Sequence, residues 1–172
     1  MNPRPDWLPE MEPVDGDISA VVGRLYAVFH RDVVMGRPRL RQTELWWDRR
    51  PTDVFGFRFE EGFWHLVSRD YEIWTAAGRE WRRDFDPPRA QRLPWFTPTV
   101  QHADSTGVLV WDYLEADRKV NTYIWLRDWD YLILLRKRPQ RCGDVYFLKT
   151  AYHVDGPATR TKLHRKYEKR CG

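Results

Sequence analysis

Apolar residues recur at helical spacing in the first third of the chain, and they predict one amphipathic helix there. The positions that share this spacing are Ile18, Val21, Val22, Leu25, Phe29 and Val33. Asp15 or Asp17 can cap the beginning of this helix with a side-chain oxygen. Gly36 and Pro38 are expected to end it, because both residues break helical patterns.

The segment before this helix, residues 1–16, contains four prolines and several acidic residues. Proline has no backbone N–H and fixes its own φ angle, so this composition disfavours regular structure. We therefore expect residues 1–16 to form a loose arm.

The next two apolar runs resemble short strands. They cover residues 40–47 and 54–59, and the polar residues 49–53 lie between them with a proline at position 51. Two strand-like runs on either side of a turn-rich stretch are typical of a β-hairpin. The pattern predicts a hairpin whose turn lies at residues 49–53.

Short helices and one loop are expected in the following forty residues. Residues 60–70 place apolar side chains around His65 and predict a helix. Residues 75–88 are polar and end in two prolines, so we expect a loop there. Residues 89–95 and 100–102 predict two short helical segments.

The C-terminal half alternates between strand-like runs and turns, which is typical of an antiparallel meander. The runs are residues 108–113, 120–126, 130–137 and 144–152. Residues 131–135 are apolar at every position, so this strand should be covered on both faces. Asp155 and Pro157 begin a final helix whose apolar stripe is thin.

These elements predict an α+β fold, in which N-terminal helices and a possible short hairpin pack on a C-terminal four-strand antiparallel meander. A basic C-terminal helix follows the meander. The 172 residues suit one domain. We expect that domain to cover residues 17–172, with a helical part over 17–105 and the sheet with its terminal helix over 106–170.

The chain is moderately basic, with 29 Lys and Arg against 25 Asp and Glu and a formal net charge of +4. The excess is concentrated in the final helix, at Arg160, Lys162, Arg165, Lys166, Lys169 and Arg170. A basic block suits a polyanion such as nucleic acid. From charge alone, a solvated helix face is the slightly better explanation.

The cysteine pattern and the hydropathy indicate a reducing cytoplasm. Cys142 and Cys171 lack the spacing of a disulfide framework or of a zinc site. No apolar run approaches the length of a membrane span, and the N-terminus has no apolar signal region. We expect a cytoplasmic protein that has no metal, no cofactor and no contact with a membrane.

His65 and a pair of arginines are the first candidates for chemistry. Histidine has the ordinary pKa closest to neutrality and suits acid–base work, although a histidine among apolar residues is more often structural. Arg89 and Arg92 lie on one side of a helical turn. Their planar guanidinium groups suit a phosphate, but arginines also commonly form surface ion pairs.

The last strand supplies the remaining candidates. Strict alternation places Leu148, Thr150 and Tyr152 on one face, so two hydroxyls would lie side by side at its end. Threonine and tyrosine are also good strand formers, and on spacing alone that explanation is the better one. The common phosphate-loop, dinucleotide and serine-hydrolase motifs are absent from the sequence.

Five segments, taken in order, carry a resemblance to a known family. They are residues 61–66 (EGFWHL), 85–95 (FDPPRAQRLPW), 125–135, 149–152 (KTAY) and 162–167 (KLHRKY). Together they resemble the phage-associated branch of the BECR nucleases, the superfamily that includes barnase, EndoU and the RelE toxins. The resemblance covers roughly residues 20–168.

The resemblance implies an active site on the sheet face, with a helix-borne histidine, an arginine, and a threonine and an aromatic residue on the final strand. By position, the expected catalytic residues are His65, Arg92, Thr150 and Tyr152. The residues expected to bind substrate phosphates are Arg89, Lys162, Arg165 and Lys166. Arg89 also competes with Arg92 for the place of the catalytic arginine.

The expected activity is therefore endonucleolytic cleavage of RNA without a metal ion, in which the 2′-hydroxyl attacks the adjacent phosphate. A toxin or a phage-related nuclease would fit, with an antitoxin or a phage protein as a second partner. Two alternatives stay open: a nucleic-acid-binding module without catalysis, and a protein-interaction domain. The sequence leaves the RNA target and the oligomeric state open.

Overall fold

The predicted first helix is present in the computed structural model, which describes residues 3–171. Helix α1 (Ile18–Phe29) buries its apolar stripe and continues as a π-helical segment, η1 (His30–Met35). The Asp17 carboxylate caps it by accepting the Ala20 N–H at 2.9 Å. The π-helix ends at Gly36, where a Cβ would overlap the Asp32 carbonyl oxygen.

Residues 3–16, expected as a loose arm, lie against the body of the protein. Leu8 is buried in the main core, and the Trp7 ring stacks on His102 with centroids 4.4 Å apart. The Trp95 indole N–H donates to the Pro9 carbonyl at 2.9 Å. The two apolar side chains thus anchor a segment that the prolines keep irregular. Residues 1 and 2 of that arm, and Gly172, lie outside the described residues.

A six-stranded mixed sheet is the centre of the fold, with strand order β1-β2-β10-β9-β8-β7. Its strands are β1 (Arg39–Leu40), β2 (Thr43–Trp46), β7 (Val108–Leu114), β8 (Val120–Leu126), β9 (Tyr131–Gln140) and β10 (Gly143–His153). The four predicted C-terminal strands are present and pair antiparallel. However, β2 adds to the edge of β10 in parallel, and β1 pairs antiparallel with β2.

The α+β class is confirmed, but an N-terminal region of helices on a four-strand antiparallel meander is wrong. The N-terminal half supplies two strands of the sheet, because the free edge of β10 takes up β2 as a hydrogen-bonded neighbour. A pairing between segments about one hundred residues apart leaves no local signal in the sequence.

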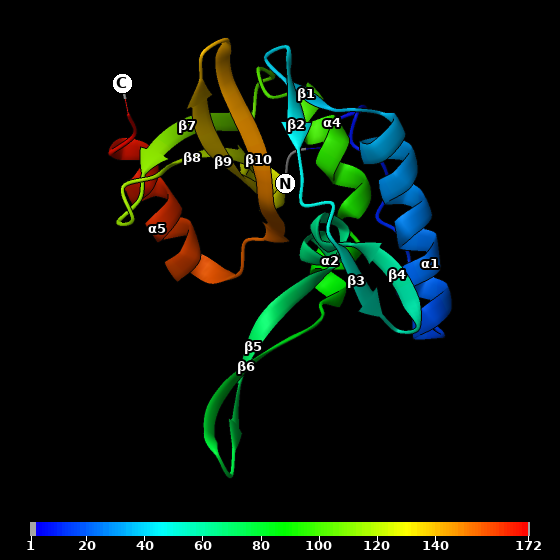
Figure 1. Ribbon diagram of the computed structural model, residues 1–172. Helices are drawn as coiled ribbons and strands as arrows, with labels where there is room; N and C mark the ends of the chain where they lie inside the picture. Colours follow the sequence, from blue (N-terminus) through cyan, green and yellow to red (C-terminus); the bar gives the residue numbers. More distant parts are fainter. Residues whose placement is uncertain (1–2, 172) are drawn as a thin grey trace.

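The two remaining hairpins also differ from the expectation. Strands β3 (Pro51–Val54) and β4 (Phe57–Glu60) turn at Phe55 and Gly56, both with positive φ, rather than at residues 49–53. Strands β5 (Ser68–Thr75) and β6 (Gly78–Phe85) form a long hairpin that projects from the body, where a loop was expected (Figure 1). Most residues of this hairpin are polar and exposed, so the sequence lacks the alternation of apolar and polar positions that would predict two strands.

Short helices connect these strands. They are α2 (Glu61–Val67), α3 (Pro87–Ala90), the 3-10 turn η2 (Leu93–Trp95), α4 (Phe96–Gln101) and the 3-10 turn η3 (Arg127–Trp129). Helix α2 confirms the helix predicted around His65, although it ends earlier, where β5 begins. The basic terminal helix is α5 (Gly156–Glu168), which buries only Leu163. Within residues 3–171, no helix combines the length and the apolarity needed to cross a membrane.

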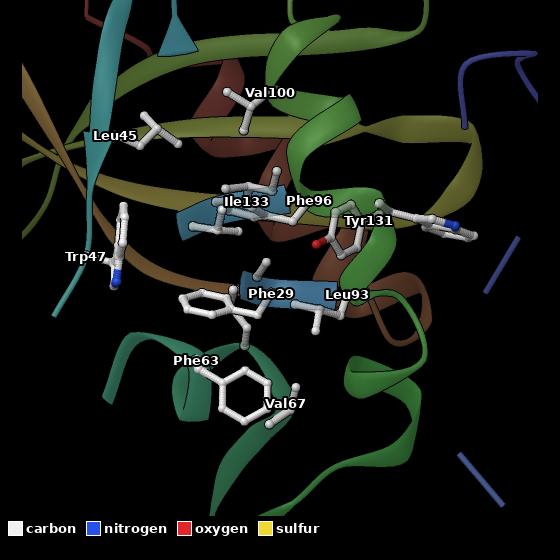
Figure 2. Packing of buried hydrophobic residues seen from close by; sticks show 14 of the residues in the cluster. Phe29, Leu45, Trp47, Phe63, Val67, Leu93, Phe96, Val100, Tyr131 and Ile133 are labelled. Carbon is white, nitrogen blue, oxygen red and sulfur yellow. The ribbon is translucent and has the colours of Figure 1, made fainter. Parts of the chain in front are cut away.

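Apolar side chains cover both faces of the sheet, as residues 131–135 predicted. On one face, Ile133 and Leu135 join the main core beneath α1, α2 and α4, to which Phe29, Phe63 and Phe96 also belong (Figure 2). On the other face, Leu132 and Leu134 belong to a smaller cluster beneath α5 that contains Trp111, Tyr123, Trp125 and Leu163. We call this second side the α5 face.

A bulge in β10 decides which side chains reach the α5 face. Leu148 pairs with Leu135, whereas Thr150 pairs with Leu134, so Lys149 is one extra residue on this strand. An extra residue reverses the alternation that follows it. Thr150 and Tyr152 therefore lie on the α5 face, opposite Leu148, and the prediction that all three share one face is wrong.

Candidate active site

His65 is held at the sheet by the loop that follows β2. The N–H groups of Glu61 and Gly62 donate to the carbonyls of Arg50 and Asp48 at 2.9 and 2.8 Å, which fixes the first turn of α2. The approach is close: a Cβ on Gly62 would lie 2.9 Å from the Trp47 side chain. The sequence folds this way because only glycine leaves room for that contact.

The imidazole of His65 lies between α2 and β10 and is open to solvent. Its Nδ1 is 3.3 Å from the Lys149 carbonyl oxygen, and its Nε2 is 3.5 Å from the Glu61 carboxylate. The side chain is 38 % exposed. A ring with one nitrogen fixed by a backbone carbonyl and the other near a carboxylate has a defined orientation, which an acid–base group requires.

Arg89 joins the helix of His65 to the end of β10. Its Nη1 donates to the Thr150 hydroxyl at 3.0 Å, to the Ser68 carbonyl at 2.5 Å and to the His65 carbonyl at 3.3 Å. The Thr150 hydroxyl itself donates to the His65 carbonyl at 3.3 Å. Thr150 therefore contacts the backbone of His65, not its ring.

Tyr152 completes this cluster. The Arg89 guanidinium lies 5.6 Å from the centroid of its ring, within the range of a cation–π contact. Burial lowers the pKa of Arg89 and raises that of Tyr152. At neutral pH the pair is therefore a cation above a neutral phenol, since arginine stays protonated even when its pKa falls.

Arg92, the other candidate arginine, lies apart from this cluster. It is buried, its Nη1 donates to the Pro88 carbonyl at 2.5 Å, and its guanidinium packs over the Trp95 ring at 5.4 Å. Among the described residues it has no hydrogen bond to His65 or Thr150. The structure thus brings Arg89, rather than Arg92, to the other candidates.

The three basic residues expected to bind phosphate on α5 divide into two kinds. Lys162 and Arg165 are exposed. The Lys166 ammonium instead contacts the Glu115 carboxylate at 2.8 Å and the Tyr123 hydroxyl at 2.6 Å. The charge of Lys166 is therefore paired within the protein, and this lysine attaches α5 to the sheet rather than binding a phosphate.

Lys149 is a functional candidate that the sequence reasoning missed. It is the extra residue of the β10 bulge, and its carbonyl is the partner of the His65 ring. Burial and the nearby charge of Arg136 both lower the pKa of Lys149. A lysine between Leu148 and Thr150 in a largely apolar strand was the available signal, but strict alternation assigned it to the opposite face.

Lys149 also lines a broad groove of about 1470 Å³. Its lining contains eight Lys or Arg residues and three Asp residues. The cations are Arg49, Arg50, Arg118, Lys119, Arg136, Lys137, Arg138 and Lys149. Charge of one sign in a concave surface concentrates the opposite charge. Because these residues come from four separate segments, no stretch of the sequence revealed the groove.

Arg89 and Tyr152 also line a smaller cavity of about 180 Å³, on the side of β10 towards α5. Its two acids lie near cations of the protein: Arg69 is 3.4 Å from Asp86 and 3.9 Å from Asp155. His153 is in turn 3.7 Å from Asp155. The larger groove, with its excess of cations, is the better site for a polyanion.

In residues 3–171, no three His, Cys, Asp or Glu side chains gather as metal ligands would. Cys142 and Cys171 are both exposed and unbridged. No protein-family model, no curated protein and no solved structure matches this chain.

Proposed function

We propose that the chain binds RNA in the basic groove and cleaves it without a metal ion. The observation that carries the proposal is the position of His65: a half-exposed imidazole bonded to the backbone of Lys149, which lines the groove. An acid–base group beside a cationic groove is the arrangement that phosphodiester cleavage needs. The cytoplasmic location and the role as a toxin or a phage-related nuclease remain predictions from the sequence.

The reaction uses the nucleophile that RNA carries. His65 accepts the proton of a 2′-hydroxyl, the 2′-oxygen forms a bond to the adjacent phosphorus, and the bond from phosphorus to the 5′-oxygen breaks. The leaving 5′-oxygen takes a proton from solvent or from an acid of the site. The products are a 2′,3′-cyclic phosphate and a 5′-hydroxyl, and acid–base help of this kind gives about 10²–10⁴-fold.

The cations of the site have the second role. Lys149 stabilises the charge that builds on the phosphoryl oxygens, because it lines the groove and its backbone carbonyl contacts the His65 ring. Arg89 acts by position: it holds Thr150 and the His65 carbonyl in place. The resemblance gave Arg92 a catalytic role, but Arg92 lies away from His65 and Thr150. In this proposal Lys149 and the other cations of the groove supply the positive charge instead.

The test is cleavage of 5′-labelled single-stranded RNA by the purified chain in EDTA. We expect fragments that end in a 2′,3′-cyclic phosphate, and no cleavage of the same sequence as DNA. His65→Ala should lower the rate by at least about 10²-fold. His30→Ala is the matched control, because His30 is exposed on η1 and outside the site.

Binding without cleavage in the wild-type chain would overturn the nuclease and leave a nucleic-acid-binding module. Full activity of His65→Ala, with His30→Ala also fully active, would remove His65 from the chemistry. Absence of RNA binding at low salt would reject the proposal as a whole and favour a protein-interaction domain. Circular dichroism of each variant ensures that a lost activity does not reflect a lost fold.

A further inference from the structure

Two aromatic side chains lie next to each other at the rim of the basic groove. Trp46 on β2 and Phe147 on β10 are register partners across the parallel pair of strands. Their ring centroids are 6.3 Å apart, with 33° between the planes. Trp46 is 49 % exposed, and neither ring belongs to either of the two apolar clusters formed by residues 3–171. The rings are therefore not explained by the packing of the fold.

An arginine lies over each ring. The guanidinium of Arg49 is 4.5 Å from the centroid of Trp47 and 5.9 Å from that of Trp46, and the guanidinium of Arg138 is 4.3 Å from the Phe147 centroid. We call Trp46, Phe147, Arg49 and Arg138 the stacking row. Arg49, Arg138 and Phe147 also line the groove, so two neighbouring rings lie between two cations at this wall.

We propose that the stacking row binds the unpaired bases of single-stranded RNA while the cations of the groove bind its phosphates. The identity of the ligand as RNA rests on the proposed function. Every base has an apolar face, so stacking on aromatic rings and guanidinium planes tolerates any sequence. In a duplex those faces are covered by the neighbouring base pairs, so a double-stranded RNA cannot use the row.

Charge favours RNA over a protein as the occupant. The groove has eight cations against three acids. Ion pairs with Asp48, Asp112 and Asp117 involve only Arg50, Lys137 and Arg136, so an excess of positive charge remains. A polyanion with flat apolar groups fits both features of this wall. A second exposed tryptophan, Trp74 on the β5–β6 hairpin, is 77 % exposed but lies outside the groove lining. It offers a matched control.

The experiment measures affinity with an oligonucleotide that cannot be cleaved. A fluorescent 2′-O-methyl RNA lacks the attacking hydroxyl, so the wild-type chain can be titrated with His65 in place. The same sequence is titrated as a single strand and as a duplex at one salt concentration. We expect tighter binding of the single strand, and Trp46→Ala should raise its Kd about 5- to 150-fold.

Trp46→Phe should restore most of that affinity, because a ring remains, and Trp74→Ala should bind as the wild type does. Equal affinity for duplex and single strand would overturn the inference, as would an unchanged Kd for Trp46→Ala or an equal loss for Trp74→Ala. A protein that binds neither form would overturn it too. Cleavage of natural RNA is scored separately, so stacking can fail while the nuclease stands, and the nuclease can fail while stacking stands.

Discussion

Arg89 donates to the hydroxyl of Thr150 at 3.0 Å, across 61 positions of the chain. The same nitrogen also bonds the carbonyls of His65 and Ser68, so one guanidinium joins α2, α3, β5 and the end of β10. A partly buried arginine that satisfies two backbone carbonyls and a hydroxyl is a structural clamp at a functional site. Its contacts make the geometry of His65 depend on residue 89.

Replacing Arg89 should lower both stability and activity. Arg89→Ala leaves the Ser68 and His65 carbonyls without this donor, and we expect a loss of about 2–5 kcal/mol in the free energy of unfolding. Urea titration measures it. Arg82→Ala, on the exposed surface of β6, is the control and should change stability by less than about 0.5 kcal/mol. Equal stability of the two variants would show that the clamp is unimportant.

Adding one methyl group at Gly62 should disturb the contact of α2 with the loop after β2. Gly62→Ala places a Cβ 2.9 Å from the Trp47 side chain and 3.2 Å from the Asp48 carbonyl. We expect a loss of about 1–3 kcal/mol and reduced RNA cleavage, because α2 must move and His65 moves with it.

Gly23→Ala is the matched control for this change. Gly23 is inside α1, and a Cβ there meets no atom within 4 Å. Alanine should therefore stabilise the chain by about 0.5–1 kcal/mol through helix propensity. Thermal unfolding of both variants is the measurement, and shifts in the same direction would contradict the assignment.

The ion pair that fastens α5 should contribute to acid stability. Burial alone would raise the pKa of Glu115, but hydrogen bonds from Lys166, Tyr123 and Asn121 lower it below the ordinary 4.5. A lowered folded pKa stabilises the protein above pH 4.5, and this stability is lost as the pH falls through the folded value. Urea unfolding should therefore show a steeper loss below pH 4.5 for the wild type than for Glu115→Gln.

Glu168→Gln is the control for the acid limb, because Glu168 is exposed at the end of α5. It should follow the wild-type curve. At neutral pH, Glu115→Gln should be less stable than the wild type by about 1–3 kcal/mol, since Lys166 loses its charged partner. Parallel acid limbs for wild type and Glu115→Gln would refute the assignment.

The groove should set the salt dependence of RNA binding. Arg118 and Lys119 line it at the turn between β7 and β8. For a single strand, each lost phosphate contact lowers the slope of log K against log salt by about 0.7, so Arg118→Gln with Lys119→Gln should lower it by up to about 1.4. Titration of the uncleavable oligonucleotide at several salt concentrations gives the slope.

A second double variant has the same change of net charge outside the groove. Arg24 and Arg31 are exposed on α1 and η1, which pack on the side of the sheet opposite the α5 face (Figure 1). Arg24→Gln with Arg31→Gln should leave the slope as it is. If both double variants lower the slope equally, net charge rather than the groove governs binding.

The sequence determined the elements whose signal is local. The stripe from Ile18 to Val33 predicted the first helix, and the four C-terminal apolar runs predicted β7 to β10. The apolar surroundings of His65 predicted α2, and Asp155 with Pro157 predicted α5. Each of these follows from periodicity and end signals within about fifteen residues, and these depend little on the rest of the chain.

Tertiary structure decided what depends on pairing between distant segments. The addition of β2 to the edge of β10, and the bulge at Lys149 that turns Thr150 to the α5 face, are properties of strand pairs. Arg89 rather than Arg92 joins the site because its guanidinium reaches β10. The two arginines are only three positions apart, so the sequence could not show which of them does so. The cations of the groove likewise come together only in the folded chain, because they lie in four separate segments of the sequence.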